Sequence, residues 1–224
     1  MADSPERWES VVSPRLADVW GRVGRACDAV GRDPAGVVLV AVTKTLPVEA
    51  IQAAYSLGVR HFGESRLAEL ESKVHSVPND SVWHFVGKIQ SNKAKRIAFV
   101  ADVLHTVENQ RQLAEFAKVD RTLDAFIQVN IDEEQQKSGI FIQDLDTVLS
   151  HVLKSYNVRF RGLMAIGRQT PDPEAARESF RKLAGLNRRI GGEWLSMGMS
   201  HDFEVALQEG ATHIRVGTAL FGSR

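Results

Sequence analysis

The sequence predicts an α/β protein built as a single-domain (β/α)8 TIM barrel with an extra N-terminal helix. Eight short apolar segments alternate with stretches of helical periodicity, and such alternation favours parallel strands joined by right-handed crossovers. Residues 37–42 form an unbroken apolar run, which is typical of a strand buried on both faces. The chain has 224 residues, close to the ~250 of a typical barrel of this kind.

A doubly wound open sheet is the alternative arrangement of alternating strands and helices. Such sheets often carry a G-x-G-x-x-G turn after the first strand, whereas this chain has Thr43-Lys44-Thr45-Leu46 there. The sequence also contains no obvious linker, low-complexity tract or close internal repeat. We therefore expect one domain over residues 1–224, in which residues 1–36 form a helical extension packed on the barrel.

The expected elements follow one another in regular order after a first helix at residues 5–30. Strands are expected at residues 37–42, 59–63, 82–86, 103–107, 125–131, 158–166, 194–197 and 213–217. Helices are expected at residues 48–57, 65–74, 91–100, 109–117, 145–152, 174–190 and 200–207. Ser91 and Asn109 are the expected caps of their helices.

Composition narrows the classes of function. Lysine plus arginine equal aspartate plus glutamate at 28 each, and this zero net charge argues against a nucleic-acid partner. Cys27 is the single cysteine, which excludes an intrachain disulfide and a cysteine-based metal cluster, and we expect no metal site. The first residues lack a secretory pattern and no run approaches ~20 apolar residues, so we expect a cytoplasmic protein without a membrane span.

A lysine follows the first strand where that strand is expected to leave the barrel. In barrels of this kind, the chemistry collects at the carboxyl ends of the strands. Lys44 leaves an apolar wall, so poor solvation is expected to lower its pKa and favour the neutral amine. A neutral amine forms a Schiff base with an aldehyde. The competing interpretation is a structural ion pair, which is the commoner role for a lysine at a strand end.

Glycine and hydroxyl side chains follow the last two strands, which is where such barrels commonly bind phosphate. They lie in residues 196–200 and 215–218, and glycine there lets backbone N–H groups approach an anion closely. The plainer alternatives are that Ser200 is a helix cap and that Gly217 and Thr218 form a turn.

Charged and titratable residues near these loops constrain the site further. Arg215 lies inside an apolar strand and needs a partner, for which Glu64, a backbone carbonyl and a ligand atom are the alternatives. Asp202 and Glu204 have to point away from a bound phosphate. His84, between two aromatic residues, is expected to be a core histidine with satisfied hydrogen bonds.

Motifs in a fixed order run from the first strand to the end of the chain. They are Ala41-Val42-Thr43-Lys44-Thr45, Phe62-Gly63-Glu64, Trp83-His84-Phe85-Val86-Gly87-Lys88-Ile89-Gln90-Ser91-Asn92-Lys93, Gln128-Val129-Asn130, Lys137-Ser138-Gly139, Gly162-Leu163-Met164-Ala165-Ile166, Leu195-Ser196-Met197-Gly198-Met199-Ser200 and Arg215-Val216-Gly217-Thr218. This ordered set resembles the pyridoxal 5′-phosphate (PLP) homeostasis protein family, whose members are relatives of the N-terminal barrel of alanine racemase.

The resemblance implies PLP as the cofactor, held as a Schiff base on Lys44. It implies that Ser200, Gly217 and Thr218 bind the phosphate, and that Arg215 lies near the pyridine nitrogen. A positive donor at that nitrogen disfavours ring protonation, and an unprotonated ring is a weaker electron sink. The other lining residues that the resemblance implies are Met164, Ser196 and Met197.

Two classes of function compete on this basis. The first is a non-catalytic PLP-binding protein of intracellular PLP homeostasis, with no catalytic residue and with apo PLP-enzymes as recipients. The second is a PLP-dependent amino-acid racemase, which needs a second acid or base opposite the lysine. The sequence favours the first, because it ends after the expected barrel and both tyrosines, Tyr55 and Tyr156, lie in or at the ends of expected helices. A sugar-phosphate enzyme with Lys44 as Schiff-base former is a third interpretation.

Some points stay open at the level of sequence. The family commonly has asparagine where this chain has Ser65, so no cofactor contact is expected from that position. A monomer is expected because no long amphipathic seam stands out. The sequence does not decide whether Lys93 or Lys137 offers a second PLP site.

Overall fold

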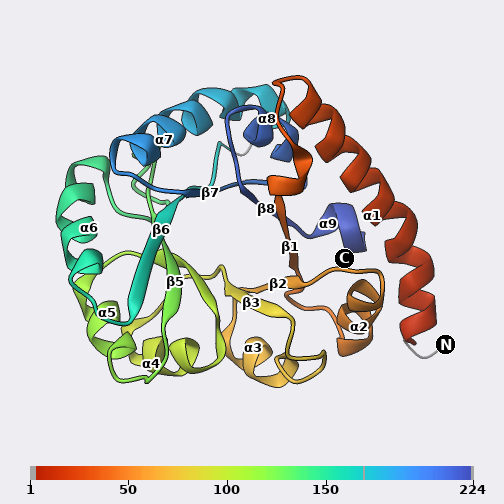
Figure 1. The fold of residues 1–224 in the computed structure, drawn as a ribbon, viewed down its shortest axis with the longest axis horizontal. Coiled ribbons are helices and arrows are strands. Elements are labelled where there is room, and N and C mark those ends of the chain that lie inside the picture. The colour runs from red at the N-terminus through yellow and green to blue at the C-terminus, as the bar shows by residue number, and fades with distance from the viewer. Residues whose placement is uncertain (1–3, 169, 223–224) are drawn as a thin grey trace.

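Eight parallel strands close into a barrel in chain order, and β8 pairs back to β1. The computed structural model describes residues 4–168 and 170–222, so residues 1–3 of the expected extension lie outside the described residues. The strands are Val38–Val42 (β1), His61–Glu64 (β2), Val82–Phe85 (β3), Val103–Val107 (β4), Leu123–Gln128 (β5), Val158–Met164 (β6), Trp194–Met199 (β7) and His213–Val216 (β8). This closure confirms the (β/α)8 barrel and excludes the open sheet (Figure 1).

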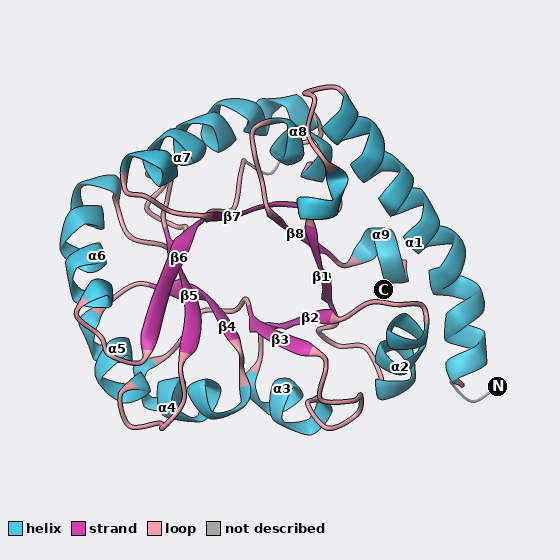
Figure 2. Cartoon of the chain, viewed as in Figure 1, coloured by secondary structure: helices cyan, strands magenta, loops and turns pink. Residues whose placement is uncertain are grey.

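Helices surround the strands on the outside of the ring (Figure 2). They are Pro5–Asp28 (α1), Val48–Ser56 (α2), Leu67–Lys73 (α3), Ser91–Val100 (α4), Gln110–Phe116 (α5), Leu145–Leu153 (α6), Arg177–Arg189 (α7), Phe203–Gln208 (α8) and Thr218–Phe221 (α9). Short 3-10 turns are Pro34–Gly36, Ile142–Asp144 and Pro173–Ala176. No helix in the described part of the chain is long and apolar enough to cross a membrane.

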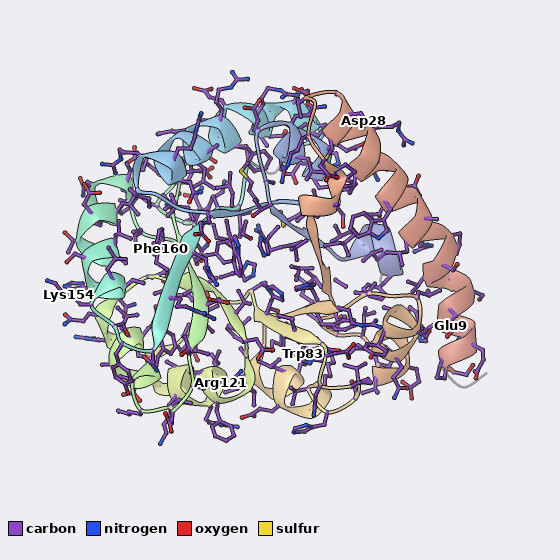
Figure 3. The ribbon with its side chains drawn as sticks, in the orientation of Figure 1. Glu9, Asp28, Trp83, Arg121, Lys154 and Phe160 are labelled. Carbon is purple, nitrogen blue, oxygen red and sulfur yellow. The ribbon has the colours of Figure 1, made fainter. Side chains whose placement is uncertain are left out.

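The first helix lies along the outer edge of the molecule, where it packs against α2, α8 and α9 (Figure 1). Glu9 and Asp28 mark its two ends in Figure 3. Its buried face includes Val12 and Val19, and Arg22 forms a 2.7 Å ion pair with Glu204 of α8. The helix thus covers the first and last elements of the barrel.

The apolar core is divided between two layers. The larger layer lies between the strands and the helices, and the centre of the ring, which looks open in Figure 2, is filled with side chains in Figure 3. A small separate cluster of Val103, Phe126 and Met164 packs with the inward-facing side chains. His84 and His105 are also buried, so the barrel interior is unusually polar.

Of the two expected helix caps, one is confirmed and the other is wrong. Asn109 accepts a hydrogen bond from the Gln112 N–H and forms a complete capping box, as expected. Ser91 does not cap its helix, because it is already the first helical residue and Gln90 takes the cap position without a side-chain bond. A serine before a helical run is a plausible cap from the local sequence, but it caps the helix only if the backbone becomes helical at the residue after it.

Candidate functional site

A cavity of about 470 Å³ opens at the carboxyl ends of the strands. Its walls come from the loops and ends of β1, β2, β3, β6, β7 and β8. The lining residues are Val42, Lys44, Ser65, Val86, Met164, Ile166, Arg168, Thr170, Met199, Ser200, His201, Asp202, Arg215, Gly217 and Thr218. Elements from both ends of the sequence therefore meet at one mouth, as the strand-end pattern predicts.

Lys44 lies in the turn that follows β1, two residues beyond the end of the strand at Val42. It lines the same cavity as Gly217, but it is exposed to solvent. The expectation of a poorly solvated amine was therefore wrong. The apolar strand ends at Val42, and the turn after it places Lys44 at the solvent-exposed mouth of the cavity.

A buried ion pair holds the turn that carries Lys44. The Lys73 ammonium donates to the Thr43 carbonyl at 2.9 Å and to the Glu64 carboxylate at 2.8 Å. Thr43 also donates its hydroxyl to Glu64 at 2.7 Å. The side chains of Glu64 and Lys73 are only 0% and 6% exposed, so both ions are removed from water. Glu64, one of the expected partners of Arg215, is therefore committed to Lys73.

The next residue of the turn has a rare backbone conformation. Thr45 has a φ of 63°, which is an outlier for a β-branched residue. Its N–H donates to the Glu69 carboxylate, which also accepts a 2.8 Å bond from Lys73. A strained conformation persists only where its surroundings fix it. The carboxylate and ammonium therefore set the position of Lys44 from both sides of the turn.

Arg215 is a buried residue in the lining of the cavity, and its hydrogen-bond partners are neutral. Its guanidinium donates to the Ser196 hydroxyl at 2.6 Å and to the Ala165 carbonyl at 3.0 Å. Burial lowers the pKa of Arg215 to about 10, and the negative charge of Asp202 opposes that shift. The side chain remains charged at neutral pH, so a backbone carbonyl and a serine satisfy its bonds without cancelling its charge.

Ser200 caps a helix, but not the one that follows it. Its hydroxyl accepts bonds from the Gly217 N–H at 3.2 Å and the Ala219 N–H at 3.1 Å, at the start of α9. The helix after Ser200 begins only at Phe203. The two loops expected to bind phosphate are thus joined directly, with Thr218 as the first residue of α9.

The acidic residues after Ser200 are turned away or engaged. Glu204 pairs with Arg22 of α1, on the outside of the barrel. Asp202 lines the cavity, but one of its oxygens accepts the Met199 N–H at 2.7 Å. Gly198, with a φ of 89°, is required here, because a Cβ would meet the Ala206 Cβ at 2.6 Å.

The remaining expected residues lie at different depths. Met164 lines the cavity, and Ser196 contacts it through Arg215. Met197 is fully buried in the outer hydrophobic layer and is not among the described lining residues. Ser65, from which no cofactor contact is expected, also lines the cavity.

Sequence reasoning missed several lining residues, and one of them is a cation. Arg168 follows β6 by four residues, and its guanidinium lies 3.6 Å from the Asp132 carboxylate. A basic residue in a loop after a barrel strand was the available signal. The apolar lining residues Val86 and Ile166 stand in the matched motifs but received no role, because an apolar residue at a strand end is equally suited to the core.

Comparison with known proteins agrees with this barrel. Residues 28–224 match the family described as alanine racemase, N-terminal domain, which defines the class of barrel. The pyridoxal phosphate homeostasis protein of Pseudomonas aeruginosa is 40% identical over 223 residues, with 96% of each chain covered. The chain belongs to the pyridoxal phosphate homeostasis protein family.

Solved structures extend the comparison to three dimensions. PipY of Synechococcus elongatus, solved with PLP bound, is 32% identical, with a TM-score of 0.77 over 90% of this chain and 100% of that chain. The alanine racemase of Corynebacterium glutamicum is 15% identical, with a TM-score of 0.69 over 93% of this chain and 62% of that chain. The second likeness is one of fold alone.

The Lys73→Met variant tests the buried pair. It leaves the Glu64 carboxylate buried without its counter-charge, so we expect a loss of about 3–5 kcal/mol in the free energy of unfolding, measured with urea. The double variant Glu64→Leu/Lys73→Met removes both charges and is expected to recover part of that loss. The matched control is Arg96→Met, whose exposed pair with Glu71 is worth at most about 1 kcal/mol. Equal losses for Lys73→Met and Arg96→Met would contradict the assignment.

Buried imidazoles make stability depend on pH. Burial lowers the pKa of His213 to about 3 and those of His84 and His105 well below the usual range. The unfolded chain, with histidine pKa values near ~6.5, therefore binds more protons, and stability falls as pH drops through that value. We expect about 1 kcal/mol lost per histidine between pH 6.5 and 5.5.

Urea unfolding at pH 7.5, 6.5 and 5.5 measures this slope. His213→Phe removes one titrating group and is expected to flatten it, whereas His75→Gln, at an exposed position, is expected to leave it unchanged. Stability that stays constant between pH 7.5 and 5.5 would show that these imidazoles are not held neutral.

Proposed function

We propose that this chain is a non-catalytic PLP-binding protein of intracellular PLP homeostasis, which holds PLP as a Schiff base on Lys44. The observation that carries the proposal is that Lys44, Arg215 and the joined loops at Ser200 and Gly217 line one cavity. The names of its relatives and the PLP in PipY support it.

The residues of the cavity fit this cofactor. A volume of about 470 Å³ lies in the range of small-ligand pockets, ~300–1,000 Å³. Lys44, Arg168 and Arg215 give the described lining three cations against the single carboxylate of Asp202, which suits an anion. A Cβ on Gly217 would come no closer to the protein than 3.5 Å, at the Val42 carbonyl, so protein packing does not demand a glycine there. Close approach of a ligand explains it better.

Each residue then has a defined task. PLP supplies an aldehyde that condenses with an amine, and Lys44 is the amine at the mouth. Ser200 and Thr218 offer hydroxyl donors to the phosphate at the start of α9, and Gly217, whose N–H is bonded to Ser200, leaves room for its close approach. The Arg215 guanidinium lies deeper, as a charged donor for the ring nitrogen, and it disfavours protonation there. An unprotonated ring withdraws electrons less strongly, so such a site is better suited to holding the cofactor than to catalysing a reaction with it.

Racemisation is the alternative, and the described residues give it little support. It needs a second acid or base beside Lys44. The Tyr55 hydroxyl donates to Asp80 at 2.7 Å, and the Tyr156 hydroxyl donates to the Ala117 carbonyl, both outside the cavity lining. His201 is the imidazole in the lining, and its Nε2 lies 3.0 Å from the Pro171 carbonyl. We therefore expect no racemisation of free amino acids.

Further expectations from the sequence stay predictions. They concern a monomeric state, a cytoplasmic location and transfer to apo PLP-enzymes. A second PLP site at Lys137 is also untested. Lys137 pairs with Glu134 at 2.7 Å and lines a separate cavity of about 530 Å³ beside the first.

Borohydride reduction tests the Schiff base on Lys44. We expect PLP-loaded protein to absorb visible light as an imine, and reduction to fix the cofactor mass to a peptide containing Lys44, read by mass spectrometry. Lys44→Arg keeps the positive charge but forms no imine, so it is expected to lose the label. Lys93→Arg and Lys137→Arg are matched controls that are expected to retain it. Label retained in Lys44→Arg would overturn the assignment, and racemase turnover by the wild type would overturn the non-catalytic role.

Gly217→Ala tests the phosphate loops more sharply than removal of the Ser200 hydroxyl, which also uncaps α9. The new methyl enters the cavity and meets Val42 only at ordinary contact distance. We expect stability to change by less than about 1 kcal/mol and the affinity for PLP to fall about tenfold or more, measured by absorbance titration. Pyridoxal, which lacks the phosphate, is expected to bind both proteins alike.

Gly185→Ala on the outer helix α7 is the control, because nothing lies within 4 Å of the added Cβ. Equal PLP affinity for Gly217→Ala and the wild type would place the phosphate elsewhere.

A further inference from the structure

A continuous row of hydrogen-bonded side chains runs through the barrel below the cavity. Arg215 donates to the Ser196 hydroxyl, which lies 2.9 Å from Nδ1 of His105. Nε2 of His105 lies 2.8 Å from Nδ1 of His84, and Nε2 of His84 lies 3.0 Å from Nδ1 of His61. The five residues come from β8, β7, β4, β3 and β2, so the row crosses the barrel from strand to strand.

The row connects two cavities. Its upper end, Arg215, lines the candidate cofactor site. Its lower end, His61, is half-buried and lines a second cavity of about 400 Å³ at the amino ends of the strands. Between them His84 and His105 are completely buried, a place where barrels normally carry branched aliphatic residues. Apolar residues would fill this space without the cost of burying polar rings, so packing alone does not explain the imidazoles.

The chemistry of the donors gives the row a direction. A guanidinium only donates, so Ser196 accepts from Arg215, and each neutral imidazole has one donor and one acceptor nitrogen. Because Arg215 is positively charged, the ring nitrogen on the Arg215 side of each histidine is more stable with a lone pair than with an N–H group. Ser196 then donates to Nδ1 of His105, and the Nε2–H groups of His105 and His84 donate to Nδ1 of His84 and of His61. All three histidines are therefore Nε2–H tautomers.

The surrounding charges are consistent with neutral rings. Burial lowers the pKa of His84 and of His105, and the neighbouring His213 ring lowers both further. Asp102 and Asp124 line the lower cavity but are paired with Arg121 and Arg161 at 2.5 and 2.8 Å. A protonated ring in the row would also face Arg215 without a carboxylate between them.

We propose that His61, His84 and His105 are positioning residues that act through Ser196 to hold the Arg215 guanidinium at the ring-nitrogen end of the cofactor site. This inference rests on the proposed function, because it takes Arg215 as the group that faces the ring. The three histidines act as one directed row, so a change at His61 reaches Arg215 through three side chains without touching the cofactor cavity.

The tautomers are tested first, on the full chain without PLP. Long-range ¹H–¹⁵N NMR on histidine-labelled protein is expected to show a protonated Nε2 and an unprotonated Nδ1 for His61, His84 and His105. Signals are assigned by single His→Gln variants, with exposed His75 as the reference. An Nδ1–H tautomer, or a mixture, in any of the three would overturn the directed row, and this result does not depend on cofactor binding.

The effect on Arg215 is tested by the absorbance of bound PLP as a function of pH. Loosened Arg215 opposes ring protonation less, so His105→Phe and His61→Phe are expected to raise the midpoint by about half a unit and to weaken PLP binding about threefold. His213→Phe is the matched control, because His213 bonds to Thr212 and is outside the row. Its midpoint is expected to match the wild type.

The outcomes separate the two proposals. A wild-type protein that binds no PLP contradicts the proposed function and leaves the tautomer test to decide the row. A wild-type protein that binds PLP, with midpoints unchanged in both row variants, refutes the positioning role. If either variant fails to fold, as judged by circular dichroism, His105→Asn replaces it. Its amide keeps a partner for Ser196 but loses His84, and a wild-type midpoint there would restrict the role to Ser196 and refute the longer row.

Discussion

The ammonium of Lys73 is the charge on which the candidate site depends. It reaches the Thr43 carbonyl and the carboxylates of Glu64 and Glu69, and so joins α3 to the turn after β1. The desolvation of this ion and of Glu64 is costly, and hydrogen bonds offset it only where the geometry is complete. One Glu64 oxygen has no partner within the described residues, so the pair is a device for placing the turn rather than a source of stability. Without it, the Glu69 carboxylate that holds Thr45 at a positive φ would lose its bond to Lys73.

The two ends of the cavity bind by different physical means. At the mouth, the Ser200 hydroxyl accepts from the N–H groups of Gly217 and Ala219, so its own O–H remains as a neutral donor for an anion at the start of α9. At the base, the hydrogen-bond partners of Arg215 leave its positive charge uncancelled, because Ser196 and the Ala165 carbonyl are neutral. A carboxylate in their place would cancel that charge before any ligand arrived. The site therefore offers neutral donors at its mouth and a positive charge at its base.

The sequence was sufficient for the barrel and for most of its rim, because both follow from local patterns. An unbroken apolar run marks β1, and residues at strand ends converge once the strands are parallel. Lys73 could not be found in this way, since a lysine on a helix normally indicates the solvated face. His105, inside a strand, carried no signal for a partner on β7. The position of Lys44 after β1 was predicted correctly. Its exposure was not, because exposure depends on how far the side chain lies beyond the end of the strand, and a sequence pattern does not specify that distance.

The polar interior also explains why most stabilising apolar contacts lie between the strands and the helices rather than inside the barrel. Inside the ring, Val103, Phe126 and Met164 form only a small apolar cluster, because imidazole rings and a guanidinium occupy the space that aliphatic layers fill in other barrels. Each buried polar ring has to be matched by a partner, and each match contributes little net free energy. Most hydrophobic stabilisation must therefore come from the layer between strands and helices, which α1 extends over the first and last elements. That outer layer lets the interior remain polar enough to hold Arg215 in place.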